Sequence, residues 1–333
     1  MKDDSLTIGG QAVIEGVMMR SPDLVVTSVR KPDGEIIHRT DTFISVTKRN
    51  KVLGIPILRG AISLFETLFI GIKSLSYSAE VASEEDRKEK AGDAGDTGDT
   101  GELGKSGGGE AEKGSEPGSG GWKSNLSMGG TILIALALGM LLFFWLPLVI
   151  AEHIGVEGSV LFNIVDGLVR LAIFFLYLAL ISLWRDMRRV FEYHGAEHKC
   201  ITTYEDGQEL TLDNARRHST RHRRCGTSFL LIVMVIAIIV FIFLGRPESI
   251  TDRLRRFALV PLIAGISFEI TRWAGRQSGG RFLKIITAPG LLLQKFTTRE
   301  PSDDQIEVAL DALKRVLHME EVEQDAGSSQ EGP

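Results

Sequence analysis

The sequence has few cysteines, little net charge and no apolar leader, and each absence narrows the class of protein. Only two cysteines, Cys200 and Cys225, occur in 333 residues, which excludes a small disulfide-stabilised scaffold. The formal net charge is −5, so the chain is not a strongly basic nucleic-acid binder, and we expect no sequence-specific nucleic-acid partner. Residues 1–16 are too polar for a secretory signal peptide.

The acidic residues are concentrated in two segments that are poor in large apolar residues. Residues 82–121 contain 11 acidic residues, 5 basic residues and 12 glycines, and residues 318–333 contain 5 acidic residues and no lysine or arginine. Such segments cannot bury a core. We therefore predict a disordered, acidic, glycine-rich linker over residues 82–125 and a disordered tail over residues 319–333, and the rest of the chain is mildly basic.

Long charge-free runs predict a membrane protein, with the lipid bilayer as its first partner. Residues 128–150 carry no charge over 23 positions, and residues 226–245 carry none over 20. About 20 such residues can cross a bilayer as a helix, which satisfies every backbone polar group internally. Residues 159–184 predict a third span, in which Asp166 and Arg170 lie four residues apart and can neutralise each other.

A fourth, weaker span is predicted over residues 257–273, which contain Pro261, Glu269 and Arg272. The two charged residues lie in the last turn, where their side chains can reach the membrane surface. A re-entrant segment is the alternative for this run. The predicted fold class is an α-helical transmembrane bundle of about four spans within residues 126–300.

Lysine and arginine residues in the short loops predict the orientation of the bundle. Residues 151–158 contain none, whereas residues 185–225 contain nine. We therefore expect the first loop outside and the second in the cytoplasm, with both termini cytoplasmic in a multi-pass protein. Residues 246–256 oppose this assignment, because they would lie outside and contain four arginines.

The segment before the linker predicts strands followed by a helix. Residues 25–29 and 35–40 are rich in β-branched residues and flank a Pro-Asp-Gly turn, so we predict a small β-rich cytoplasmic region over residues 1–54. Residues 55–81 predict an amphipathic helix that lies in the membrane interface or packs on the bundle. Its polar stripe repeats every seven residues, at Arg59, Glu66 and Lys73.

A short cytoplasmic helix is predicted after the bundle, over residues 301–318. It begins with Pro301 followed by Ser-Asp-Asp, which is typical of an N-cap and an acidic first turn. Apolar residues then recur at helical spacing and give it one apolar face.

Residues 192–200, EYHGAEHKC, hold the strongest candidates for chemistry. His194 and His198 are four residues apart, so on a helix they share a face and can bind one Zn²⁺ ion. The string matches H-x-x-E-H, in which two histidines bind zinc and the glutamate, here Glu197, activates water. Gly195 weakens the predicted helix.

Three interpretations of these residues remain open. His222 and Cys225 lie three residues apart in the second half of the loop and would complete four protein ligands, with Cys200 and His218 as spares. Four ligands close a structural site, whereas three leave an open position for catalysis. In the third interpretation no metal binds, and the loop contacts lipid phosphate groups.

Five arginines lie within nine residues beside the predicted span at 226–245. They are Arg216, Arg217, Arg221, Arg223 and Arg224. Such a cluster sets topology and binds anionic lipids. The alternative is contact with a ribosome, an RNA or a phosphorylated substrate.

Several segments in order resemble the YqhQ-like family of bacterial membrane proteins, which has been labelled "predicted metal-dependent enzyme". The matching segments are GGQAVIEGVMMR at 9–20, GIPILRGAISLFETL at 54–68, EYHGAEHKCI at 192–201, RCGTSF at 224–229 and TAPGLLLQKFTTREPSDDQIEVA at 287–309. The resemblance implies a protein of the bacterial inner membrane. It also implies motif positions for the five candidate site residues, which are His194, Glu197, His198, His222 and Cys225. Arg223 departs from the family pattern, which often has proline there.

The resulting functional hypothesis is a metal-dependent hydrolase that acts on a membrane-bound substrate at the cytoplasmic face. Zn²⁺ is the expected cofactor. The alternative is a non-enzymatic scaffold that partners the protein-export or insertion machinery or a ribosome. A transporter is a third hypothesis, based on the ionisable groups Asp166, Arg170 and Glu269 inside the predicted spans.

Overall fold

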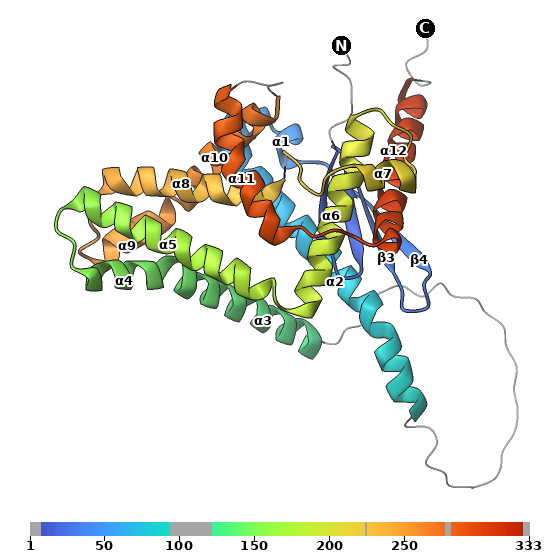
Figure 1. Ribbon diagram of the computed structural model, residues 1–333, viewed down its shortest axis with the longest axis horizontal. Helices are drawn as coiled ribbons and strands as arrows, with labels where there is room; N and C mark the ends of the chain where they lie inside the picture. The colour runs from blue at the N-terminus through green and yellow to red at the C-terminus, as the bar shows by residue number, and fades with distance from the viewer. Residues whose placement is uncertain (1–7, 94–121, 224, 277–280, 329–333) are drawn as a thin grey trace, which may run out of the picture.

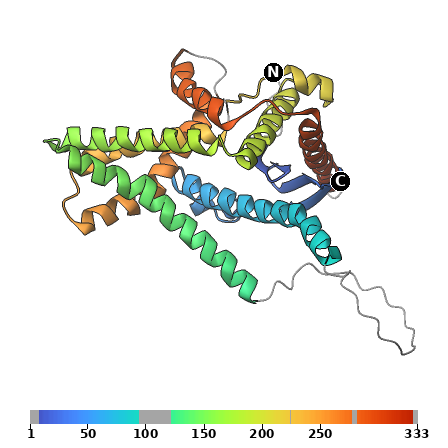
Figure 2. The same cartoon turned by 60° about the horizontal axis from the view of Figure 1, so that its bottom comes forward.

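The computed structural model describes residues 8–93, 122–223, 225–276 and 281–328. Long apolar helices form a bundle, and a small sheet lies beyond one end of them with helices on both of its faces (Figures 1 and 2). The predicted class, a mostly helical protein with a small N-terminal sheet, is confirmed.

The sheet has four antiparallel strands in the order β1-β2-β3-β4, which is also their order in the chain. They are β1 (Gly9–Val13), β2 (Gly16–Arg20), β3 (Leu24–Arg30) and β4 (Ile36–Thr42). Both central strands are buried on both faces, which explains their nearly continuous apolar sequence. The Pro-Asp-Gly turn predicted at 32–34 joins β3 to β4, and Gly34 has a φ of +91° there.

Helix α2 (Leu58–Asp93) covers one face of the sheet. It extends beyond the predicted range of 55–81 and into the predicted linker at 82–125. The last residues of that predicted linker belong to another helix, α3 (Trp122–Met140). The rest of that linker, residues 94–121, lies outside the described residues. Short helices α1 (Val46–Arg49) and η1 (Lys51–Gly54) precede α2.

Each residue of the predicted polar stripe of α2 has a partner from another element. Arg59 pairs with Glu269 of the bundle at 2.6 Å, and Lys73 pairs with Asp41 of β4 at 2.7 Å. Glu66 accepts hydrogen bonds from the Ser45 hydroxyl at 2.9 Å and from a backbone amide of α1 at 2.8 Å. The stripe therefore joins α2 to the sheet and to the bundle.

Within the described residues, four helical stretches are long and apolar enough to cross a membrane, in agreement with the number predicted. They are Leu133–Ile154, Ser159–Ile181, Gly226–Leu244 and Ile250–Ala274. The first comprises the end of α3, a π-helical turn η2 (Leu141–Trp145) and α4 (Leu146–Ile154). The others are α5 (Ser159–Ile181), α8 (Gly226–Leu244), and the pair α9 (Ile250–Ala258) and α10 (Val260–Arg276).

Two of the four arginines of residues 246–256, Arg253 and Arg256, are held by contacts with the bundle. Arg256 donates hydrogen bonds to the side chain of Asn163 and to the carbonyl of Gly245, both at 2.6 Å. Arg253 pairs with Glu152 at 2.9 Å. These contacts give two of the arginines in this short segment, at the end of the bundle away from the sheet, a structural role.

The second face of the sheet is covered by α6 (Arg185–Glu205) and α12 (Asp303–Ser328), which pack together on it. The segment predicted as a loop over residues 185–225 is thus largely helical, with α7 (Leu212–Arg217) after α6. Helix α12 continues past the predicted end at 318 into the predicted tail. Helix α11 (Arg281–Thr297) joins the bundle to α12.

Candidate metal centre

The H-x-x-E-H string lies within α6, close to the end of the bundle that faces the sheet (Figure 1). Gly195 does not interrupt the helix. The chain that leaves α11 crosses α6 at this residue: the amide of Arg299 donates to the carbonyl of Phe191 at 2.9 Å. A Cβ atom on Gly195 would lie 2.0 Å from the carbonyl oxygen of Arg299. The glycine therefore permits a close crossing that places α11 beside the two histidines.

Replacing Gly195 by alanine is expected to destabilise the protein by about 1–3 kcal/mol, the usual cost of overpacking. Alanine favours a helix by at most about 1 kcal/mol over glycine, so the clash with Arg299 decides the sign. Thermal unfolding in detergent, followed by tryptophan fluorescence, measures the effect. Gly226→Ala is the matched control, because its Cβ would meet nothing within 4 Å. Equal unfolding temperatures for Gly195→Ala and wild type would contradict the crossing.

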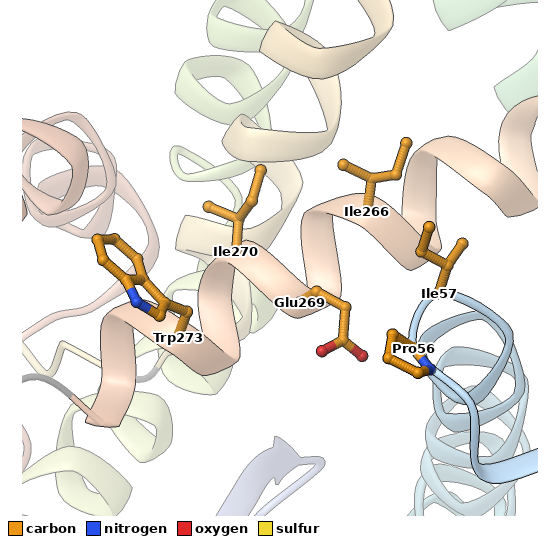
Figure 3. Close-up of a pocket in the computed structure, with 6 residues that line it drawn as sticks. All are labelled: Pro56, Ile57, Ile266, Glu269, Ile270 and Trp273. Atoms are coloured by element: carbon orange, nitrogen blue, oxygen red, sulfur yellow. The ribbon is translucent and has the colours of Figure 1, made fainter.

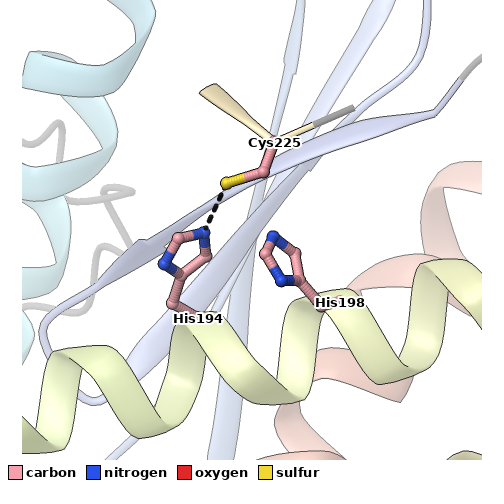
Figure 4. A group of neighbouring side chains, drawn as sticks. All are labelled: His194, His198 and Cys225. Carbon is pink, nitrogen blue, oxygen red and sulfur yellow. Dashed lines mark hydrogen bonds between the residues drawn. The ribbon is translucent and has the colours of Figure 1, made fainter. Parts of the chain in front are cut away.

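Three of the candidate ligands, His194, His198 and Cys225, lie close together and are called the triad below. One ligand atom from each of His194, His198 and Cys225 lies within 4.8 Å of the other two. The sulfur of Cys225 is 3.2 Å from Nε2 of His194, and the two imidazole rings are 4.4 Å apart between centroids (Figure 4). Two residues one turn apart on α6 thus meet a third from the start of α8.

Both histidines are oriented by backbone carbonyls. Nδ1 of His194 is 2.8 Å from the oxygen of Thr297, and Nδ1 of His198 is 2.6 Å from the oxygen of Thr220. A carbonyl can only accept, so each Nδ1 carries a proton, and in a neutral ring Nε2 is then the nitrogen with the lone pair. Metal-binding histidines typically have this arrangement. Burial lowers the pKa of His198, which further favours the neutral ring.

Cys225 occupies the N-cap of α8, where its sulfur accepts a hydrogen bond from the amide of Thr227 at 3.5 Å. The hydroxyl of Thr227 lies 3.1 Å from the same sulfur. A helix N-terminus favours negative charge on a capping group. The position therefore suits a thiolate ligand.

Glu197 is buried next to the triad and packs against β1. Its carboxyl carbon and Oε1 lie 2.8 Å from the place where a Cβ of Gly10 would be, so a side chain at Gly10 would displace it. Oε2 of Glu197 and Nε2 of His198 are both buried without a hydrogen-bond partner among the described residues. Burial raises the pKa of Glu197. An unpaired buried nitrogen on His198, which belongs to the cluster with His194 and Cys225, fits a site that binds a cation.

His222 is adjacent to the triad without belonging to it. Its ring lies 5.7 Å from that of His198, and its Nε2 is 3.1 Å from a carboxylate oxygen of Glu205. The backbone of His222 is bound by Gln294, which donates to its carbonyl at 2.8 Å and accepts from its amide at 2.9 Å. The structure thus brings together three of the four expected ligands and assigns His222 to the wall of the site.

The two spare candidates point elsewhere. The sulfur of Cys200 is buried in the core beneath the sheet, 3.8 Å from the carbonyl oxygen of Ile306, and burial raises the pKa of this thiol. Nε2 of His218 is 3.3 Å from the side-chain oxygen of Gln208. Neither joins the triad.

Four of the five clustered arginines are described, and all four are exposed: Arg216, Arg217, Arg221 and Arg223. Arg216 forms ion pairs with Asp213 of α7 and Asp303 of α12, so it links these helices. Arg224 lies outside the described residues. The exposed members remain candidates for binding phosphate groups.

Sequence reasoning missed the groups that orient the ligands. The carbonyls of Thr220 and Thr297 have no side-chain signature, so no sequence pattern could have revealed them. Gln294 lies in the segment 287–309 that resembles the family, and that resemblance was the available signal.

A separate open pocket, of about 380 Å³, lies between the start of α2 and α10. Its walls are mainly apolar, and it is lined by Pro56, Ile57, Ile266, Glu269, Ile270 and Trp273 (Figure 3). Glu269, the charged member of this lining, is paired with Arg59. The pocket does not include the metal triad.

Comparison of the sequence with known proteins shows the family to which the chain belongs. The sequence matches the family described as "Protein of unknown function (DUF1385)" over residues 55–319, which include the triad and Glu197. The chain belongs to this family. It is also 30% identical to "Uncharacterized protein YqhQ" of Bacillus subtilis (strain 168) over 322 residues, which cover 94% of this chain and 92% of the relative. The resemblance stated from the sequence is confirmed. No solved structure shows a significant match to the chain.

Proposed function

We propose that the protein is a metal-dependent hydrolase of the bacterial cytoplasmic membrane, with Zn²⁺ held by His194, His198 and Cys225. The observation that carries the proposal is the orientation of the two histidines. Each donates to a backbone carbonyl through Nδ1, and Nε2 of His194 is hydrogen-bonded to the sulfur of Cys225 at 3.2 Å, whereas Nε2 of His198 has no hydrogen-bond partner among the described residues. A mixed nitrogen and sulfur ligand set in a reducing compartment suits zinc.

Three protein ligands, rather than four, favour catalysis over a structural role. Catalytic zinc sites keep one coordination position for water or substrate, whereas structural sites are closed. His222, the fourth candidate from the sequence, is held toward Glu205 and Gln294 instead. A bound zinc ion would polarise a substrate carbonyl or phosphoryl oxygen and make water a better nucleophile.

Glu197 is the residue of this chain that would move protons. It lies on the same helix as both histidines, three residues after one and next to the other, and its Oε2 is unpaired. A carboxylate in this position can accept a proton from water and return it to the leaving group. Because the triad lies at the end of the bundle, the substrate would be bound at or in the membrane, with the triad and both termini cytoplasmic.

The decisive experiment replaces Glu197 by glutamine in detergent-purified protein. Hydrolysis of casein, p-nitrophenyl esters and p-nitrophenyl phosphate is measured beside the zinc content. We expect activity to fall by about 10²–10⁴-fold, because general acid–base catalysis contributes about that much, while zinc is retained. Glu192→Gln on the same helix is the control, since its carboxylate binds Gln305 at 3.0 Å and belongs to another face.

Two results would reject the hydrolase. The first is full activity of Glu197→Gln in an assay that the wild type passes. The second is wild-type protein without zinc after reconstitution.

The second candidate function is a membrane scaffold for the protein-export or insertion machinery or a ribosome. It is favoured by the exposed Arg217, Arg221 and Arg223 beside the start of α8, and by the exposed apolar residues Phe65 and Phe69 on α2. A scaffold predicts that a His194→Ala/His198→Ala variant complements a deletion strain fully. The hydrolase predicts that it does not.

A further inference from the structure

The two edges of the sheet differ in their protection against pairing with another strand. Natural edge strands are commonly blunted by charged residues, proline or a bulge. The edge strand β4 (Ile36–Thr42) follows this pattern, since it contains His38, Arg39 and Asp41. The edge strand β1 has the sequence GGQAV, with no charge and no proline, and pairs with β2 residue for residue. One edge of the sheet is therefore protected and the other is not.

The register shows which backbone groups of β1 point away from the sheet. The amide of Arg30 donates to the carbonyl of Glu15 at 2.8 Å. Glu15 and every second residue after it on β2 therefore form backbone hydrogen bonds with β3. The residues of β2 between these positions form backbone hydrogen bonds with β1, where their partners are Gly9, Gln11 and Val13. Gly10 and Ala12 therefore direct their amide and carbonyl groups outward. Their backbone groups make no hydrogen bond to another described residue.

The first residues of this free edge are exposed, and they lie next to Glu197. Gly9 and Gly10 are exposed, and a Cβ on Gly9 would meet nothing within 4 Å. The inner face of Gly10 is in contact with the carboxyl of Glu197. On α6, Glu197 lies between the side of the helix that packs on the sheet and the side that carries the histidines. A chain laid along β1 would thus pass next to Glu197.

We propose that the free edge of β1 binds an extended polypeptide segment, through the backbone groups of Gly10 and Ala12, and presents it to the triad. The occupant is a polypeptide because the edge offers donors and acceptors alternating at strand spacing, and a peptide backbone has the complementary pattern. The absence of side chains at Gly9 and Gly10 leaves room for substrates of varied sequence. The cleavage part of this inference rests on the proposed hydrolase, whose substrate class becomes peptides.

The reaction is peptide hydrolysis with water as the co-reactant. The C–N bond breaks and a C–O bond forms between the carbonyl carbon and the oxygen of water. Glu197 accepts one proton of that water and transfers it to the leaving amine. The products are one carboxylic acid and one amine, and no oxidant or reductant is needed.

The experiment measures binding separately from cleavage. The full chain with Glu197→Gln is titrated with fluorescein-labelled β-casein, an unfolded polypeptide, and anisotropy is followed in detergent. Ala12→Pro removes an outward amide without breaking a bond to β2, as proline is tolerated at an edge. Gly9→Lys adds a charge of the kind that blunts natural edges. Thr40→Pro is the control, since Thr40 is an outward position of β4 by the same register.

We expect Ala12→Pro and Gly9→Lys to weaken casein binding by about tenfold or more, the value of one or two lost backbone hydrogen bonds. Thr40→Pro should bind like the parent protein, and all variants should contain the same amount of zinc. Unchanged binding by both β1 variants would overturn the proposal. The proposal would also be overturned if the parent protein failed to bind casein and the β1 variants lost self-association. The edge would then pair with a second copy of the chain.

The two proposals fail in different ways. Casein binding that depends on β1 in a protein without zinc would reject the hydrolase and support the edge. Zinc-dependent hydrolysis of esters, with no binding or cleavage of casein, would support the hydrolase and reject the edge.

Discussion

Replacing both His194 and His198 by alanine is expected to reduce bound zinc from about one ion per chain to near zero, because two of three protein ligands are lost. Cys225 alone cannot hold the ion, and its sulfur would retain contacts only with Thr227. Elemental mass spectrometry on purified protein measures the change. Hydrolysis should disappear together with the metal.

His218→Ala is the matched control for this variant. It removes an imidazole from the same segment, and that imidazole contacts Gln208 and Asp206 rather than the triad. It should leave the zinc content unchanged. Zinc at the wild-type level in the double variant would show that the ion binds elsewhere. Replacing Thr220 or Thr297 would not be informative, because their backbone carbonyls orient the rings.

The long apolar helices were predictable because each is decided by a long local run of residues. Residues 226–245 carry no charge, and α8 occupies almost the same range. The ends of α2 and α12 were not predictable from the sequence. Its acidic and glycine-rich composition predicted disorder where the structure continues both helices. Composition alone sets no sharp end to a helix. In the structure, each of these helices continues beyond the part that packs on the sheet or the bundle.

The candidate site shows the limit of spacing arguments. His194 and His198 share a face because both lie on one helix, and this was predictable. The spacing of His222 and Cys225 allowed either to complete the site. The choice depends on Gln294, which binds the backbone of His222 from a helix about 70 residues away. Contacts of that separation leave no periodicity in the sequence.

The partners of the polar stripe on α2 were equally hidden. The seven-residue spacing of Arg59, Glu66 and Lys73 predicted one polar stripe on a helix that lies in the membrane interface or packs on the bundle, but not the partner of each charge. In the structure Arg59 reaches Glu269, 210 residues away. Glu269 was expected in the last turn of its helix, where it could extend to the membrane surface, but α10 continues to Arg276 and the ion pair supplies a protein partner for Glu269 near the middle of the helix.

Asp166→Asn is expected to destabilise the bundle by about 3–5 kcal/mol, the usual cost of removing one partner from a buried ion pair. Asp166 is 1% exposed and accepts a hydrogen bond from Arg170 at 2.9 Å. Arg256 approaches the same carboxylate oxygen at 3.9 Å and is 2% exposed. Without the carboxylate, the two buried guanidinium groups of Arg170 and Arg256 would lose the counter-charge that they share between α5 and α9. Thermal unfolding in detergent measures the loss.

Two further variants separate the charge from the packing at this place. Glu248→Gln, an exposed acid at the same end of the bundle, should change stability by less than about 0.5 kcal/mol. Asp166→Leu/Arg170→Leu removes both partners and should recover part of the loss, since apolar residues often replace a buried ion pair at little cost. Wild-type stability of Asp166→Asn would contradict the structural role. If such a variant folded normally and still failed to complement a deletion strain, the result would favour the transporter hypothesis, in which the buried charges have a functional role.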